Sequence, residues 1–173
     1  MSQSKKMLLG QIGGSFKGSR PRDLLLQSNG GVCSRDAARH TGDPALFWQG
    51  VTNANDGNTG TQTTCGGGVT AYTDYLKCTL AQTYRVTRLH VYGSTANDFD
   101  GFQYWDGSAW QPLAVTWNGL GWNNPAGADY AVNGGYVDAQ EFAVKARQQA
   151  SSGLTLNTLE IWGDDIGAAG AAF

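Results

Sequence analysis

The chain has 173 residues, a length that suits one domain with a sizeable core. Only 15% of its residues are charged, and its 25 glycines are about twice the usual ~7% share, a composition typical of turn-rich β structure. No apolar run approaches the ~18 residues of a membrane span, and no amphipathic helix of ~12 residues is evident.

Residues 1–31 are predicted to be a basic, glycine-rich arm rather than a core element. Residues 1–39 carry seven Lys or Arg against two Asp, a net of +5, whereas residues 40–173 carry five bases against twelve acids, a net of −7. One interpretation is a solvated tail. The other is an arm that docks on an acidic surface, including that of another copy of this chain. Nucleic-acid binding is not favoured, because Phe16 is the arm's single aromatic for stacking. The candidate assembly residues are Lys5, Lys6, Lys17, Arg20 and Arg22.

The body, residues 32–163, is predicted to be an all-β, antiparallel jelly-roll sandwich, followed by a small-residue tail at 164–173. Tyr84–Gly93 and Leu154–Gly163 are β-rich segments that each end in an aromatic residue and glycine. Between them, Phe102–Trp110 contains an Asp-Gly turn signal and is predicted to be a hairpin. A bulge near Thr87 would let Val86 and Leu89 both face inward, with His90 at the surface or between strands.

The three cysteines, Cys33, Cys65 and Cys78, are an odd number without a C-x-x-C pair, so a zinc site is not expected. Cys78 is predicted to be a small buried residue on a strand. A Cys65–Cys78 disulfide is the alternative.

Four sequence blocks, in order, resemble the discoidin, or coagulation-factor C-type, domains, whose jelly roll also underlies galactose-binding-like carbohydrate modules. Asn53–Thr61 resembles the loop A-x-D-G-N-x-x-T, and Asp74–Gly93 resembles a strand pair that ends in V-x-V-Y-G. Phe102–Trp110 resembles the hairpin Y-S-x-D-G-x-x-W, and Leu154–Gly163 resembles the closing strand L-x-E-L-E-V-Y-G.

The resemblance implies a structural Ca²⁺ held by the first of these blocks and an acid from the last strand. Asp56, Asn58, Thr61 and Glu160 would supply the hard oxygen ligands that Ca²⁺ prefers. The chain departs from the family pattern at Thr63, where a tryptophan is usual. A turn without metal is therefore the alternative.

The resemblance also places binding at loops on one end of the sandwich. Two loops, Asn97–Asp100 and Thr116–Gly135, are rich in aromatic, Asn and Asp residues, which suit sugars. The candidate ligand-binding residues are Trp117, Trp122, Asn123, Asn124, Tyr130, Asp98 and Asp100. In the alternative, Trp117 and Trp122 cap the sandwich or pack against a neighbouring subunit. The Arg/His pair that often binds galactose in the family has no match here.

Two non-enzymatic functions follow from these features. The chain has two histidines and neither a nucleophile elbow nor a histidine metal cluster, so catalysis is not expected. The favoured interpretation is a structural, decoration or tail-fibre-type subunit of a bacteriophage particle, made in a host cytoplasm without a signal peptide. Its partners would be other copies or other virion proteins. The alternative is a carbohydrate-binding module that recognises a cell-surface glycan through aromatic loops.

Overall fold

The computed structural model describes residues 22–39, 47–65, 75–93, 98–117, 127–147 and 154–166. Within these ranges the chain forms strands and short 3₁₀ turns and no α-helix, and every strand pair is antiparallel. The strands are β1 (Arg22–Asp23), β2 (Val32–Asp36), β3 (Trp48–Gln49), β4 (Thr63–Cys65), β5 (Tyr75–Gly93), β6 (Asp98–Trp105), β7 (Trp110–Pro112), β8 (Val115–Trp117), β9 (Ala128–Val132), β10 (Val137–Arg147) and β11 (Leu154–Asp165). The 3₁₀ turns are η1 (Gln27–Asn29), η2 (Ala37–Arg39) and η3 (Val51–Asn55).

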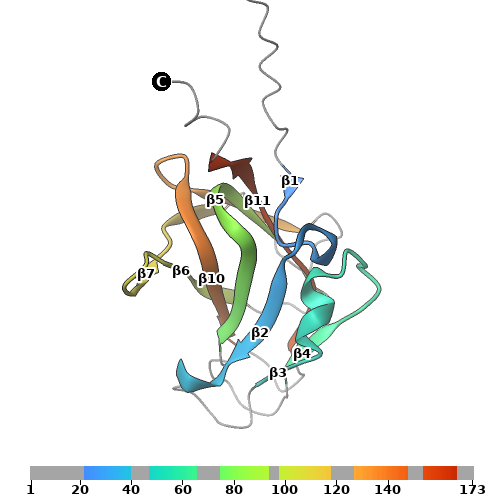
Figure 1. Ribbon diagram of the computed structural model, residues 1–173. Helices are drawn as coiled ribbons and strands as arrows, with labels where there is room; N and C mark the ends of the chain where they lie inside the picture. The colour runs from blue at the N-terminus through green and yellow to red at the C-terminus, as the bar shows by residue number, and fades with distance from the viewer. Residues whose placement is uncertain are drawn as a thin grey trace, which may run out of the picture.

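The long strand β5 joins two layers, as Figure 1 shows. Its first half pairs with β2 and β10, and β6 and β7 continue that front layer. Its second half pairs with β11 and β9, and β4, β3 and β8 continue the back layer. The predicted all-β jelly-roll sandwich is confirmed. None of the helices among the described residues has the length and apolarity that crossing a bilayer would require.

The core lies between the two layers and follows the alternation of the strands. In the first half of β5, Leu76, Cys78 and Leu80 are buried, and the residues between them are only partly so. The rings of Phe102 on β6 and Tyr130 on β9 meet across the core with centroids 4.8 Å apart.

The predicted bulge in β5 is confirmed at Thr87. Trp162 on β11 is opposite Arg88, but the next residue, Gly163, is opposite Val86, so no residue of β11 is directly opposite Thr87. A Cβ on Gly163 would lie 2.0 Å from the carbonyl oxygen of Arg85, which explains why this position needs glycine.

The predicted hairpin is also confirmed, since Trp105 of β6 is opposite Trp110 of β7. In the turn, the Asp106 carboxylate accepts hydrogen bonds from the backbone N–H groups of Ser108 and Ala109, both at 2.8 Å. Gly107 takes a φ of 100°, which a residue with a side chain rarely adopts.

The sandwich begins earlier than residue 32, so the predicted arm boundary is wrong. Arg22 and Asp23 pair with β11, and Leu24 and Leu25 are 1% and 0% exposed. The sequence offered a clue in the short apolar run of residues 24–26, which an arm would leave in water. The other candidate assembly residues, Lys5, Lys6, Lys17 and Arg20, lie outside the described residues.

At the other end, the sandwich extends beyond residue 163. β11 continues through Asp164 and Asp165, which are opposite Arg85 and Tyr84. The two ends of the described fold are close together, since Arg22 Nη2 lies 3.6 Å from Asp165 Oδ1. The predicted tail is therefore at least two residues shorter, and residues 167–173 lie outside the described part of the chain.

All three cysteines are buried free thiols, and the predicted burial of Cys78 is confirmed. The sulfur beside Cys78 belongs to Cys33, directly opposite on β2, at an Sγ–Sγ distance of 3.8 Å. Cys65 lies instead on β4, opposite Leu154. A Cys65–Cys78 disulfide is therefore not formed.

Candidate functional site

The predicted aromatic loop is shorter than the 20 residues expected, because strands occupy both of its ends. Trp117 ends β8 and is opposite Tyr130 of β9. Trp117 is 52% exposed, whereas the Tyr130 ring packs on Phe102 against the core. Trp117 is thus placed where a ligand can reach it, and Tyr130 has a structural role whatever else it does.

The remaining predicted ligand residues are only partly located. Asp98 and Asp100 lie on β6, and Asp98 is opposite Arg147 of β10. Trp122, Asn123 and Asn124 lie between Trp117 and Gly127, outside the described residues.

Three of the four predicted calcium ligands come together in one loop. Asp56 accepts a hydrogen bond from the Asn58 backbone N–H at Oδ1 (2.8 Å) and from the Thr61 hydroxyl at Oδ2 (2.7 Å). The Asn58 side-chain oxygen accepts the N–H of Gly60 at 2.9 Å. This is a self-contained network of Asx turns, in which both carboxylate oxygens already have donors.

The fourth predicted ligand, Glu160, lies elsewhere and does not fit. Its carboxylate accepts the indole N–H of Trp162 at 2.7 Å, two residues further along β11. The residue of β11 that reaches the loop is Asn157, whose Nδ2 donates to the carbonyl oxygens of Thr59 (2.8 Å) and Thr61 (3.3 Å). About 10 Å of strand separates the two positions. The residue of β11 at the loop is thus Asn157 and not Glu160, so the four predicted residues do not come together around one point.

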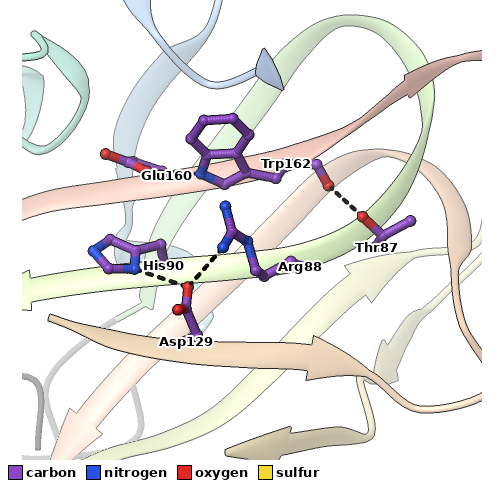
Figure 2. A network of polar contacts seen from close by, with 6 residues as sticks. All are labelled: Thr87, Arg88, His90, Asp129, Glu160 and Trp162. Atoms are coloured by element: carbon purple, nitrogen blue, oxygen red, sulfur yellow. Dashed lines mark hydrogen bonds and ion pairs between the residues drawn. The ribbon is translucent and has the colours of Figure 1, made fainter. Parts of the chain in front are cut away.

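A cluster of polar and aromatic side chains lies on the outer face of the back layer. We call it the polar cluster, and Figure 2 shows it spread over three adjacent strands. Its members are Arg88 and His90 of β5, Asp129 of β9, and Glu160 and Trp162 of β11. Strand alternation explains the arrangement, because the neighbours Leu89, Val91, Leu159 and Ile161 are buried and turn these side chains outward.

Asp129 and Trp162 organise the cluster from its two sides. Asp129 Oδ1 lies 2.9 Å from His90 Nδ1 and 3.3 Å from Arg88 Nη1. A carboxylate only accepts, so His90 donates from Nδ1. The Arg88 guanidinium also lies over the Trp162 indole, 4.8 Å from its centroid. The cluster thus presents donors, acceptors and an aromatic ring side by side, and such groups suit ligands that carry both hydroxyls and C–H faces.

The polar cluster borders the predicted aromatic loop. A Cβ on Gly127 would lie 2.5 Å from His90 Nε2, so the backbone at Gly127 lies directly against the imidazole. Sequence reasoning placed His90 at the surface or between strands, which is confirmed. It missed the cluster because Arg88, Asp129 and Trp162 meet only through pairing of distant strands. The alternating pattern of β5 and β11 was the available signal.

Comparison with solved structures identifies the fold. A family 32 carbohydrate-binding module of Clostridium perfringens NanJ, solved with galactose, is similar over 83% of this chain and 99% of the module, at a TM-score of 0.56 and 16% identity. A chitosan-binding module of a chitosanase/glucanase from Paenibacillus sp. IK-5 is similar over 82% and 99%, at 0.55 and 17%.

A family 89 glycoside hydrolase of C. perfringens, solved with GlcNAc-alpha-1,4-galactose, is similar over 81% of this chain at a TM-score of 0.60 and 12% identity. The chain spans only 15% of that hydrolase. No protein-family model matches the chain, and no curated protein matches it. The chain therefore has the galactose-binding-like, discoidin-like β-sandwich fold of these carbohydrate-binding modules.

Proposed function

We propose that this protein is a non-catalytic glycan-binding module and that the polar cluster is its binding surface. The observation that carries the proposal is a guanidinium, a carboxylate and an indole, those of Arg88, Asp129 and Trp162, side by side on a fold shared with sugar-binding modules. This alternative is better supported than the virion subunit, since none of the three structures compared is a virion protein.

The chemistry of the cluster suits a sugar. A pyranose has an apolar C–H face that packs on an indole and hydroxyls that both donate and accept hydrogen bonds. Arg88 can donate to hydroxyl oxygens, Glu160 and Asp129 can accept from hydroxyl hydrogens, and His90 holds Asp129 in place through its Nδ1–H. The exposed Trp117, opposite Tyr130 of β9, is a separate candidate contact, and Trp122, Asn123 and Asn124 stay predictions from the sequence.

A binding experiment with paired variants tests this proposal. The full chain is titrated calorimetrically with galactose and screened on a glycan array, because galactose is the ligand in the NanJ module structure. Arg88→Ala and Trp162→Ala should each weaken the best ligand at least tenfold, about 1.4 kcal/mol. Tyr136→Ala serves as the matched control, since Tyr136 is a 50% exposed aromatic on the turn between β9 and β10.

Each outcome is decisive. A glycan that binds wild type and control but not the two cluster variants supports both the function and the site. If Trp117→Ala abolishes binding while Trp162→Ala does not, the polar cluster is the wrong surface. A folded wild-type chain that binds no glycan on the array contradicts the function itself.

A further inference from the structure

A cavity of about 430 Å³ lies away from the polar cluster, beside the hairpin of the front layer. One side is formed by the hairpin residues Trp105, Asp106 and Gly107. Thr83 of β5 and the stretch of β10 from Asp138 to Glu141 form the rest. Its volume is within the range of about 300–1,000 Å³ typical of small-ligand pockets.

The strand register builds this cavity. Phe142 is opposite Tyr104, so Glu141 and Trp105, one residue further on each strand, are neighbours on the outer face. Trp110 supports the Trp105 ring edge-on, with centroids 5.7 Å apart. The register of β10 against β5 shifts between Ala139 and Glu141, which interrupts the regular pairing beneath the cavity.

Three carboxylates line the cavity, and the cationic partners of two of them stand outside it. Arg85 holds Asp138 through two hydrogen bonds of 3.0 and 2.9 Å, and Lys77 Nζ lies 2.9 Å from Glu141 Oε1. Neither cation is among the lining residues. Asp106 forms no ion pair within the described part of the chain and is held by neutral donors of the hairpin and by Gln111.

Both aspartates remain anionic at neutral pH. Hydrogen bonds from Ala109 and Ser108 hold the pKa of Asp106 well below its usual range, and the Arg85 guanidinium lowers the pKa of Asp138. The lining therefore carries negative charge that the flanking cations offset only in part.

The lining also offers more acceptors than donors. Its three carboxylates accept only, whereas the Trp105 indole and the Thr83 hydroxyl can donate, and Nε2 of Gln140 already donates to the carbonyl of Leu80 at 3.1 Å. A ligand that brings hydrogen-bond donors and positive charge, and that presents an apolar face to Trp105, therefore fits this lining best.

We infer that this cavity binds a hexosamine unit whose amino group is a free ammonium. Its C–H face would pack on Trp105, and its ammonium and hydroxyl hydrogens would reach Glu141, Asp138 and Thr83. A lysine side chain shares the ammonium but lacks the ring and the hydroxyl donors. The inference rests on the proposed function, because it assumes a glycan reader, but it uses a different surface.

Matched oligosaccharides and variants test the inference. The full chain is titrated with the glucosamine trimer and with its N-acetylated counterpart, which has the same ring geometry and no charge. The glucosamine trimer should bind at least tenfold more tightly, and its affinity should fall as salt is raised. Glu141→Gln should weaken it about tenfold, and Thr83→Lys, which places a cation at an exposed lining position, should weaken it at least as much. Asp165→Asn, which removes a carboxylate outside the cavity, should change it less than twofold.

Several results would overturn the inference. Equal affinity for the two trimers excludes recognition of the ammonium, and unchanged binding by both cavity variants excludes this location. Oligolysine that binds as tightly as the glucosamine trimer shows a peptide site instead. If galactose binding depends on Trp162 while no trimer binds, the cavity fails and the proposed function stands. If no glycan binds anywhere, both fail.

Discussion

The two outer surfaces of this sandwich use the same kinds of residue to different effect. The polar cluster of the back layer is spread across three strands, and Arg88 lies inside it, over the indole and beside Asp129. The cavity of the front layer also has a tryptophan and carboxylates, but its cations, Arg85 and Lys77, hold those carboxylates from outside. The cluster is therefore mixed in charge and the cavity is acidic.

We infer from this difference that the position of the cation, rather than composition, sets the ligand preference proposed for each surface. A guanidinium inside a site supplies donors to neutral sugars, whereas one behind the carboxylates leaves acceptors for a cationic ligand. Variants that alter one surface and leave the other intact test whether the two surfaces bind different ligands.

The largest loss of stability is expected from Gly127→Ala, which should disturb the polar cluster and leave the cavity intact. Gly127 has a φ of 70°, and an added Cβ would lie 2.5 Å from His90 Nε2 and 2.8 Å from the carbonyl oxygen of Val91. Left-handed backbone costs about 1–2 kcal/mol for a residue with a side chain, and the displaced imidazole adds to this. We expect a loss of about 3 kcal/mol in the free energy of unfolding, measured by urea denaturation.

The same variant separates the two surfaces. It should lose galactose binding and keep wild-type affinity for the glucosamine trimer, since Gly127 does not line the cavity. The exposed turn residue Gly134, with a φ of 82° and open space around it, provides the control. Gly134→Ala should show the backbone cost without the loss of binding. Similar binding by both variants would contradict the structural role of Gly127 beside His90.

A smaller effect is expected from Asn157→Ala, which tests how β11 holds the loop of Asp56. The change removes the side chain of the buried Asn157 and leaves the carbonyls of Thr59 and Thr61 without their donor. We expect the free energy of unfolding to fall by about 2 kcal/mol. The wild-type melting temperature should be the same in Ca²⁺ and in chelator, because Glu160 lies away from the loop and both carboxylate oxygens of Asp56 already accept hydrogen bonds. A rise of several degrees with Ca²⁺ would show that the loop rearranges to hold the ion.

Much of the fold followed from local sequence signals. Alternation in Tyr84–Gly93, the bulge at Thr87 and the Asp106-Gly107 turn are properties of neighbouring residues, and all three were predicted correctly. Leu24 and Leu25 were misassigned because their burial depends on β11, more than 130 residues away. The polar cluster and the cavity likewise depend on strand register, which one sequence without homologues does not specify. The position of Glu160 away from the Asp56 loop depends on the same register.

The smallest change in stability is expected at Asp23. This residue and Asp106 are two aspartates whose surroundings move their pKa values in opposite directions. Burial raises the pKa of Asp23 to about 6, although backbone N–H groups of Ile161 and Leu25 oppose the shift, and nearby Glu160 of the polar cluster adds to it. The exposed Asp106 of the cavity has a lowered pKa instead, because hydrogen bonds from the hairpin stabilise its charge.

An unfolded aspartate titrates near pH 3.9, so between about pH 4 and 6 the folded chain binds more protons at Asp23 than the unfolded chain does. Asp23 therefore contributes full stability below about pH 4, and that stability is lost as the pH rises through about 6.

Asp23→Asn keeps the acceptor for the N–H groups of Leu25 and Ile161 and removes the charge. We expect it to stabilise the fold by on the order of 1–2 kcal/mol at pH 7.5, and by much less at pH 4. Urea denaturation of both proteins at the two pH values measures this, and an equal effect at both would show that folding does not raise the pKa of Asp23. Because the mutation also removes repulsion of Glu160, a change in galactose affinity without one in trimer affinity would link this buried carboxyl to the back surface alone.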